Sequence, residues 1–260
     1  MLLPMPTITQ SGKSRNQIAN PLIGKAPVQH KLWSDLSEIA DFLKLPLPLN
    51  LYLEREHFQH VGYKAGQRVC RLGQPFDALY FVYSGFLKTV MFDEFGNEQV
   101  LCFPMRGDIL GLDSVHSSCY EFEVVALSDC NLIIVPYKKL IDLSRSHAQV
   151  EHALFDMLSR ELATQHVRMS MLGKISAHAR VCMFLIMLSE RFEELGYSKN
   201  EFNLRMTRQE IGSYLCITLE TVSRILSSLK ENGIIHVHQR RICIHDLKQL
   251  RKLANEDRSV

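Results

Sequence analysis

The spacing of hydrophobic residues changes along the chain and predicts where helices and strands lie. From residue 146 to 172 no proline or glycine interrupts the sequence, and apolar residues recur at helical spacing. Such a helix spans ~40 Å at ~1.5 Å per residue, which is more than a small domain needs for itself. Part of its apolar stripe is therefore expected to be free for a partner, and packing of the whole helix on its own domain is the alternative. The stripe contains Val150, Ala153, Leu154, Met157, Leu158, Leu162 and Met169.

Shorter helical patterns lie on either side of this segment. The apolar residues of Leu32–Leu45 again follow a helical period. After Gly173, which we interpret as a hinge, a second helix is predicted over Ala177–Leu195, ending at Gly196. Residues 1–30 are rich in Pro, Ser, Gly, Asn and Lys without a hydrophobic period, which is typical of a flexible tail.

Between Phe58 and Pro136 the pattern changes to short β-rich runs separated by glycines. Asp93–Asn97, with the sequence DEFGN, is a good hairpin turn because Gly and Asn tolerate positive φ angles. A compact all-β barrel or roll is predicted. Its clearest strands are residues 78–83, 87–92 and 99–103.

The stretch 206–226, MTRQEIGSYLCITLETVSRIL, carries the most specific pattern of the chain. Thr207 and Glu210 form a T-x-x-E capping box, so a helix is predicted to begin there. Residues 216–217 make a turn, and Thr218 is suited to cap a second helix. The apolar residues of that second helix fall at i, i+3, i+4 and i+7, which predicts one buried stripe. These residues are Val222, Ile225, Leu226 and Leu229.

The opposite face of the second helix offers Glu220, Ser223 and Arg224. Arginine can bond guanine O6 and N7, glutamate can accept from cytosine N4, and serine can bond neighbouring bases. Each good contact discriminates by ~1–3 kcal/mol between bases. Taken alone, the same face is equally well explained as a solvated surface with an incidental Glu and Arg.

The sequence after this helix favours DNA binding. A helix-stopping KENG at 230–233 is followed by Ile234–His238, a polar turn and Ile242–His245, which predicts a β-hairpin wing. Arg240 and Arg241 are expected at its tip, placed to touch phosphates. Together these elements predict a winged helix-turn-helix.

Composition and charge narrow the class of protein. Hydrophobic residues make up 46% and charged residues 22%, as in ordinary globular proteins, and the net charge is only +2. Basic residues are instead concentrated over residues 201–252, nine against five acidic ones.

No nucleophile–base set, Gly-rich phosphate loop or metal triad is present, so we expect no enzyme. Neither a signal peptide nor an apolar run of ~18 residues occurs, which predicts a cytoplasmic protein without membrane contact.

With these motifs the chain closely resembles the CRP/FNR regulators over about residues 50–252, most strongly over Met206–Ile244. The resemblance implies an α+β fold with an N-terminal β-roll of the cyclic-nucleotide-binding type, a long dimerisation helix and a C-terminal winged helix-turn-helix. It also implies a homodimer and an interaction with RNA polymerase. The expected division is a tail at 1–30, a β-roll sensor-like domain at 31–145, the dimerisation helix at 146–172 and the DNA-binding domain at 173–260.

Recognition helices of the form E-x-x-S-R mark the FNR and FixK branches of this family, and Glu220, Ser223 and Arg224 match that form. The resemblance therefore implies an inverted repeat of TTGAT half-sites as the target. Contacts to the DNA backbone are expected from Thr207, Arg208, Thr218, Thr221, Ser227, Arg240 and Arg241. One departure is Cys216, which stands where most members have glycine, so either Cys216 accepts a positive φ at a cost or the turn changes.

The roll departs from both known sensors of the family. Cyclic-nucleotide binding needs an arginine that pairs with the phosphate, but no Arg or Lys follows Asp113 before Lys138. The iron–sulfur cluster of the FNR branch uses three N-terminal cysteines and one in the roll, whereas no cysteine precedes Cys70. Gln165 stands where that branch carries an acidic residue that weakens pairing, so Gln165 favours a dimer that needs no cluster. We therefore predict no cofactor and no cyclic AMP.

Two alternatives keep the DNA-binding function but change its control. A haem or small molecule in the roll is one, and oxidation of Cys216 beside the DNA is the other. Scattered cysteines are more often small buried hydrophobes, and all seven are expected to be reduced. His236 and His238 share one face of the predicted wing, and His116 lies near Cys119. Without further closely spaced ligands we predict no metal site.

Overall fold

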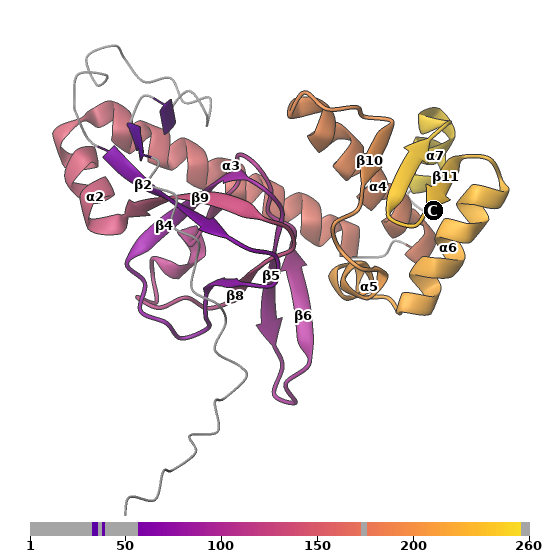
Figure 1. Ribbon diagram of the computed structural model, residues 1–260, viewed down its shortest axis with the longest axis horizontal. Coiled ribbons are helices and arrows are strands. Elements are labelled where there is room, and N and C mark those ends of the chain that lie inside the picture. The colour runs from indigo at the N-terminus through magenta and orange to yellow at the C-terminus, as the bar shows by residue number, and fades with distance from the viewer. Residues whose placement is uncertain (1–32, 36–37, 40–56, 173–175, 256–260) are drawn as a thin grey trace, which may run out of the picture.

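The computed structural model describes residues 33–35, 38–39, 57–172 and 176–255. Within these residues the chain forms a β-roll, a long helix beside it and a C-terminal helical domain (Figure 1). The predicted tail at 1–30 and the predicted hinge at Gly173 lie outside the described residues. No helix of the described part is long and apolar enough to cross a membrane.

The roll consists of two antiparallel sheets. The first has the strand order β1-β2-β9-β4-β7 and the second the order β3-β8-β5-β6. The strands of the first sheet are β1 (Trp33–Asp35), β2 (His57–Tyr63), β9 (Cys130–Pro136), β4 (Ala78–Ser84) and β7 (Ile109–Leu110). Those of the second are β3 (Arg68–Cys70), β8 (Glu123–Ala126), β5 (Leu87–Phe92) and β6 (Glu98–Cys102).

Strand β4 shows why the first sheet is apolar on both faces. Successive side chains of a strand point to opposite faces. Tyr80 and Val82 join the core between the two sheets. Leu79 and Phe81 join a second core, which helices cover from the other side. A strand buried on both faces shows an almost continuous apolar run, as the sequence ALYFV does here.

The predicted turn between β5 and β6 is confirmed. Asp93 Oδ1 accepts hydrogen bonds from the backbone N–H of Phe95 at 2.9 Å and of Asn97 at 2.8 Å. Gly96 takes a φ of +80°, which a glycine adopts without a steric penalty. The β5–β6 hairpin projects from the roll, as Figure 1 shows.

The predicted helix over Leu32–Leu45 is wrong at its start. Trp33–Asp35 is a strand, β1, paired antiparallel with β2. Ser34 is buried there, with its Oγ 2.7 Å from His60 Nε2, so edge pairing and this hydrogen bond outweigh the helical period. Residues 38–39 are helical, and the rest of the predicted helix lies outside the described residues.

Two helices follow the roll where the sequence predicted one. Helix α2 (Tyr137–Ser146) was missed, and the long helix α3 (Ala148–Leu172) begins only after it. They are separated at His147, whose backbone is extended, with φ −139° and ψ 107°. The predicted helix at 146–172 therefore corresponds to α3 alone, and α2 lies before it. A short 3-10 helix, η2 (Leu112–Ser114), lies within the roll.

The C-terminal domain has the predicted winged-helix elements. Helix α4 (Ala177–Glu194) begins at its cap Ser176 and is followed by β10 (Glu201–Asn203), α5 (Arg208–Leu215) and α6 (Leu219–Glu231). Strands β11 (Ile235–His238) and β12 (Arg241–Ile244) form a three-stranded sheet with β10, and α7 (Leu247–Asn255) packs on α4.

The core of this domain continues into the roll. Val90 and Val100 of the β5–β6 hairpin belong to the same buried cluster as Leu215 and Leu226 of α5 and α6. Phe103, directly after β6, stacks at an angle against Tyr214 with ring centroids 5.3 Å apart. The two parts are therefore joined by a shared hydrophobic interface rather than by the chain alone.

Candidate nucleic-acid interface

Helix α5 starts at the capping box that the sequence predicted. The backbone N–H of Glu210 donates to Thr207 Oγ1 at 3.2 Å, and the backbone N–H of Thr207 donates to Glu210 Oε2 at 2.6 Å. Burial alone would raise the pKa of Glu210, but hydrogen bonds from Thr207 and Lys88 hold it below its usual value. These two reciprocal hydrogen bonds satisfy backbone N–H groups at the helix start that have no partner within the helix.

The turn between α5 and α6 holds Cys216 in the left-handed region, with φ 53° and ψ 47°. Of the two outcomes expected for this position, the structure has the first: Cys216 accepts a positive φ, and its side chain is exposed. Gly212 was not singled out from the sequence. A Cβ at Gly212 would lie 2.7 Å from the carbonyl oxygen of Ile217, so this glycine lets the turn pass close to α5.

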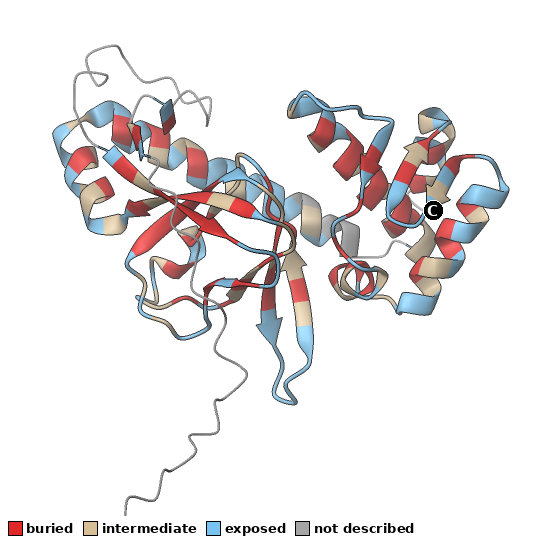
Figure 2. Ribbon diagram, viewed as in Figure 1, coloured by how far each residue is buried: buried red, intermediate tan, exposed pale blue. Residues whose placement is uncertain are grey.

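Helix α6 buries the stripe that its period predicted. Val222, Ile225, Leu226 and Leu229 are all buried, and Thr218 caps the helix by accepting from Thr221 N at 3.2 Å. On the other side Glu220, Arg224 and Ser227 are exposed and Ser223 is half-buried. Figure 2 shows the alternation of buried and exposed residues along this helix. The three predicted base-reading side chains thus share one accessible face near the N-terminus of α6.

The wing differs from its prediction in one respect. Gln239 forms the turn with a φ of +54°, and Arg240 is exposed there, donating from Nη1 to the carbonyl oxygen of Arg205 at 3.2 Å. Arg241 is instead the first residue of β12, opposite Asn203, and its guanidinium forms an ion pair with Glu201. Only Arg240 lies at the tip, because pairing with β10 draws Arg241 into the sheet.

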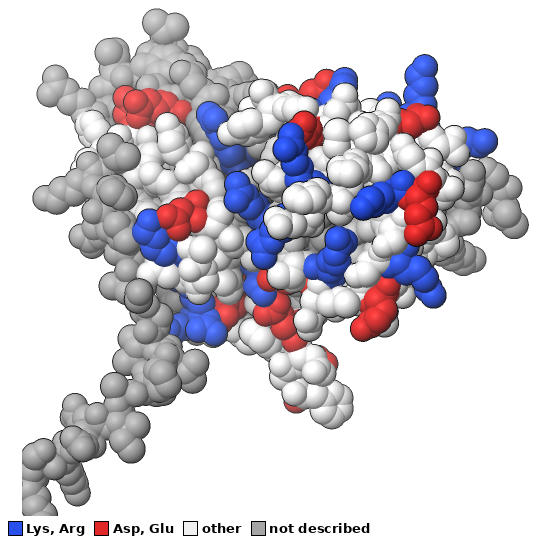
Figure 3. Space-filling view, turned by 45° about the vertical axis from the view of Figure 1, so that its right-hand side comes forward, with Lys and Arg blue, Asp and Glu red and all other residues white. Residues whose placement is uncertain are grey.

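Arg208, at the start of α5, is half-buried, and its Nη1 has no hydrogen-bond partner among the described residues. Thr207 and Thr221 use side-chain or backbone groups in the two helix caps. Figure 3 shows Lys and Arg side chains spread over the face that the C-terminal domain turns forward, with acidic side chains between them. The local basic excess that the sequence indicated is thus displayed at the surface of this domain.

An unforeseen ion-pair cluster joins α5 to the roll. The Nζ of Lys88 in β5 lies 2.6 Å from Oε1 of Glu98 in β6 and 3.0 Å from Oε1 of Glu210, which also forms the capping box. Burial alone would lower the pKa of Lys88, but the hydrogen bonds to both carboxylates raise it, so the ammonium stays charged. Ser213 of α5 accepts from the backbone N–H of Val100 at 2.8 Å through its Oγ. We call Lys88, Glu98, Glu210 and Ser213 the hinge seam.

Comparison with known proteins agrees with this arrangement. A model of the Crp-like helix-turn-helix domain matches residues 179–253, and one of the cyclic nucleotide-binding domain matches residues 60–147. The transcriptional regulatory protein btr of Bordetella pertussis is 35% identical over 199 residues, 76% of this chain and 82% of the relative. The chain belongs to the CRP/FNR family of transcriptional regulators.

Two further comparisons place this regulator near the FNR and FixK proteins. The fumarate and nitrate reduction regulatory protein of Escherichia coli is 32% identical over 195 residues, which are 75% of this chain and 78% of the relative. The solved structure of FixK2 from Bradyrhizobium japonicum has a TM-score of 0.70 and 28% identity, covering 75% of this chain and 96% of that chain. The expected fold, a β-roll of the cyclic-nucleotide-binding type with a C-terminal helix-turn-helix domain, is thereby confirmed.

The α3 helix of this CRP/FNR regulator uses its apolar stripe in two ways. Val150 and Met157 are buried against the roll and α2, and Leu154 packs on the same cluster. This half follows the alternative in which the helix covers its own domain. Further along, Leu158, Leu162 and Met169 are exposed, Leu162 and Met169 by 62% and 70%. Two neighbours on the helix, Phe155 and Gln165, are exposed as well, and Phe155 was not in the predicted stripe.

The segment from Asp113 to Glu123 carries aromatic and acidic side chains inside or beside the roll. Tyr120 is fully buried, donates to the carbonyl oxygen of Ala78 at 2.7 Å and packs edge-on against Phe76. Burial raises the pKa of the nearby Asp113 carboxyl to about 6. Glu123 is paired with Arg68 of β3 at 2.6 Å. The chain thus offers aromatic and acidic groups along this segment, which an anionic phosphate disfavours.

The cysteines of this regulator are free thiols. Cys70, Cys130 and Cys182 are buried, and burial raises the pKa of Cys70 and of Cys130 to about 12. Among the described residues no group of three or more His, Cys, Asp or Glu side chains is placed to hold a metal ion. His236 and His245 approach each other across the wing, with ring centroids 6.5 Å apart.

Proposed function

We propose that this CRP/FNR regulator acts as a homodimer that binds inverted repeats of TTGAT half-sites and reads their bases with Glu220, Ser223 and Arg224. The observation that carries the proposal is the exposed face of α6, where these side chains stand opposite a fully buried stripe. A recognition helix needs both properties, because it must pack on its domain while offering polar groups to the major groove.

The helix start supports the same assignment. Thr218 caps α6, so the helix presents the N–H groups of its first turn beside Glu220. Such N-termini attract phosphate oxygens, which positions the helix before any base is read. Thr207, Arg208, Thr221, Ser227 and the wing residue Arg240 are proposed as further backbone contacts. Arg241 remains exposed and is proposed as a contact once its ion pair with Glu201 opens.

The test is a gel-shift titration against a TTGAT palindrome and against variants that change its G·C pair. Arg224→Ala is expected to weaken binding to the intact site by ~1–3 kcal/mol and to lose most of the discrimination at the changed pair. Lys230→Ala, which removes a positive charge from the far end of the same helix, is the matched control. If the wild-type protein ignores the G·C change, the base-reading role of Glu220 and Arg224 is refuted.

Dimerisation is proposed through the exposed half of the α3 stripe, Phe155, Leu158, Leu162 and Met169, with Gln165 beside them. Exposed apolar side chains in a row on one helix are typical of an unsatisfied interface. Leu162→Glu should convert the protein to a monomer in analytical ultracentrifugation, whereas His152→Glu, near the buried start of α3, should leave the dimer intact. A dimeric Leu162→Glu variant would argue against this surface.

We further propose that DNA binding needs neither cyclic AMP nor an iron–sulfur cluster. Support comes from the buried aromatic residue Tyr120 and the acidic segment around it, and from the absence of cysteines before Cys70 in the sequence. Gel shifts with and without cyclic AMP, and iron analysis after anaerobic purification, test both parts. A haem or other bound chromophore in the absorption spectrum would favour the alternative of a ligand in the roll.

Oxidation of Cys216 is a second candidate for control, favoured by the exposure of that thiol in the turn before α6. A sulfenic acid or mixed disulfide there would add bulk beside Glu220 and weaken DNA binding. Peroxide treatment should then impair the wild-type protein and spare Cys216→Ser. Equal sensitivity of the two proteins would exclude this mechanism. Recruitment of RNA polymerase by the bound dimer completes the proposal.

A further inference from the structure

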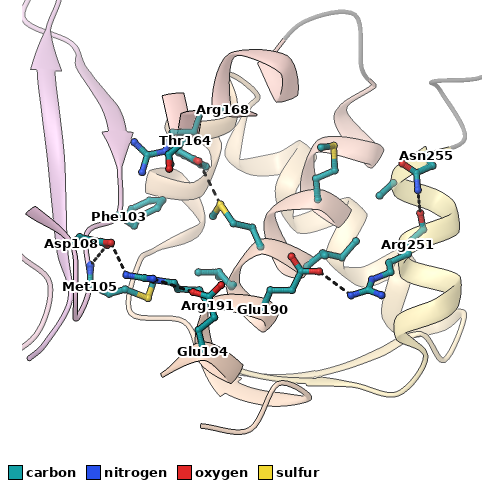
Figure 4. A pocket seen from close by; sticks show the side chains of 16 residues that line it. Phe103, Met105, Asp108, Thr164, Arg168, Glu190, Arg191, Glu194, Arg251 and Asn255 are labelled. Atoms are coloured by element: carbon teal, nitrogen blue, oxygen red, sulfur yellow. Dashed lines mark hydrogen bonds and ion pairs between the residues drawn. The ribbon is translucent and has the colours of Figure 1, made fainter. Parts of the chain in front are cut away.

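A cavity of about 570 Å³ lies where the roll, α3 and the winged-helix domain meet. Figure 4 shows that its lining comes from all three: the loop after β6, the C-terminal half of α3, and the helices α4 and α7. This volume is within the range of ligand pockets, roughly 300–1,000 Å³. The cavity is separate from the roll interior, where Tyr120 is fully buried.

One side of the cavity is apolar. Phe103 and Met105 contribute from the roll, and Met183, Ile186 and Met187 from successive turns of α4. Unbranched methionine side chains adapt to ligands of different shape, because their thioethers have several accessible rotamers. This wall suits a flat or flexible hydrocarbon body.

The rim of the cavity carries three arginines, which are paired to different degrees. Arg191 is bound to Asp108 at 2.7 Å and to Glu194 at 3.1 Å. Arg251 is bound to Glu190 at 2.8 Å. These two guanidinium groups already have close carboxylate partners, as the dashed lines in Figure 4 show.

Arg168 of α3 differs from the other two. Among the described residues it forms an ion pair only with Glu161, whose Oε1 lies 3.7 Å from Arg168 Nη1, and the same oxygen accepts a hydrogen bond from Gln165 Nε2 at 2.6 Å. Only a quarter of the Arg168 side chain is exposed. A guanidinium has five N–H donors, so Arg168 keeps hydrogen-bonding capacity for an anion beside its bond with the Tyr214 hydroxyl and its long contact with Glu161.

We propose that this cavity binds a small organic anion with an apolar body, whose carboxylate or sulfonate pairs with Arg168 while the hydrocarbon part lies on the methionine wall of α4. Resting on the proposed function, we further infer that its occupancy changes affinity for DNA. A ligand that contacts both the roll and the winged-helix domain has different affinities for different relative orientations of the two. Its binding shifts the protein toward the orientation that it binds best.

The binding test uses the full-length chain and the fluorescent anion 8-anilinonaphthalene-1-sulfonate. We expect one dye per protomer, displaced by decanoate but not by decanol. Arg168→Gln should weaken dye binding about tenfold, as expected for losing one charge-assisted hydrogen bond. Arg168→Lys should restore most of the affinity, and Met187→Trp, which fills the cavity, should abolish binding.

The control for charge is Arg160→Gln, an exposed arginine of the same helix that does not line the cavity. Dye affinities that are equal in Arg168→Gln and Arg160→Gln would place the dye elsewhere, for example on the exposed stripe of α3, and would overturn the proposal. Retained binding by a folded Met187→Trp protein, with folding checked by circular dichroism, would overturn it too.

Coupling to DNA is measured by gel shift on the TTGAT palindrome with and without saturating decanoate. We expect a change in affinity of at least about threefold, absent in Arg168→Gln. Dye binding at Arg168 without any change in DNA affinity would refute the coupling alone. Failure to bind the palindrome both with and without decanoate would refute the proposed function, while the dye titrations would still decide the existence of the site.

Discussion

Replacing Lys88 by methionine tests whether the roll holds the DNA-binding domain in place through the hinge seam. Methionine keeps the length and apolar stem of lysine and removes the charge. Lys88 is 12% exposed and Glu210 15%, so both lie largely out of solvent where β5 meets α5. The change leaves Glu98 and Glu210 near each other without a cation between them.

The expected loss follows from these contacts. A hydrogen bond to a charged group contributes roughly 1.5–3 kcal/mol when its surroundings are protected from water. The contact between Lys88 and Glu210 is protected from water in this way. Glu98 is 38% exposed, so its pair with Lys88 is screened by solvent and contributes less. Repulsion between the Glu98 and Glu210 carboxylates adds to the loss of stability. The variant no longer has to remove the Lys88 ammonium from water on folding, and this saving reduces the loss. We therefore expect Lys88→Met to lower the free energy of unfolding by about 2 kcal/mol.

Urea denaturation followed by circular dichroism measures this loss, with Lys64→Met as the control. Lys64 forms an ion pair of similar length, 2.5 Å, with Asp129, but both side chains are more than half exposed. Its removal should leave the denaturation midpoint almost unchanged. DNA affinity of Lys88→Met should fall as well, because the first helix of the helix-turn-helix loses its anchor on the roll. Equal midpoints for the two variants would refute the reasoning.

Three further predictions concern the helix-turn-helix and its joint. Gly212→Ala should cost ~1–3 kcal/mol and weaken DNA binding in a gel shift, because its Cβ would meet the Ile217 oxygen at 2.7 Å; unchanged affinity would contradict this. Cys216→Gly should raise the thermal midpoint slightly, by relieving the positive φ of 53°; a lower midpoint would show that the thiol side chain contributes packing. Because the pKa of Glu210 is lowered in the folded state, its stabilisation is present above its unfolded pKa, about 4.3, and is lost as pH falls through the lower folded value. An acid titration of Lys88→Met, monitored by circular dichroism, should show less of this loss than wild type.

Local patterns predicted the helix-turn-helix correctly. The capping box of Thr207 and Glu210, the cap at Thr218 and the buried stripe of α6 depend on residues within a few positions of each other. Such interactions are encoded in short spacings, so the sequence alone reveals them. For Cys216 the sequence left two outcomes open, a positive φ or a changed turn, and the structure has the first.

Features that depend on distant contacts were missed. The helical period predicts a helix where β1 lies, because the pairing of β1 with β2 and the bond between Ser34 and His60 join segments far apart in the chain. Arg241 was placed at the wing tip because β10 and its Glu201 were not foreseen. No short spacing indicates the hinge seam, because Lys88 and Glu210 are separated by more than a hundred residues.

The position of α5 explains how a signal received by the roll would reach DNA. One side of this helix is bound to the β5–β6 hairpin through Glu210 and Ser213, and another meets the turn before α6 at Gly212 without room for a side chain. Helix α5 has only eight residues, so these contacts lie within about two turns of each other. We therefore expect a displacement of the hairpin to move α5 and, with it, the face of Glu220 and Arg224. The cavity beside Arg168 is lined by Phe103, directly after β6, and by Tyr214 of α5, so we expect the proposed ligand to act on the same joint.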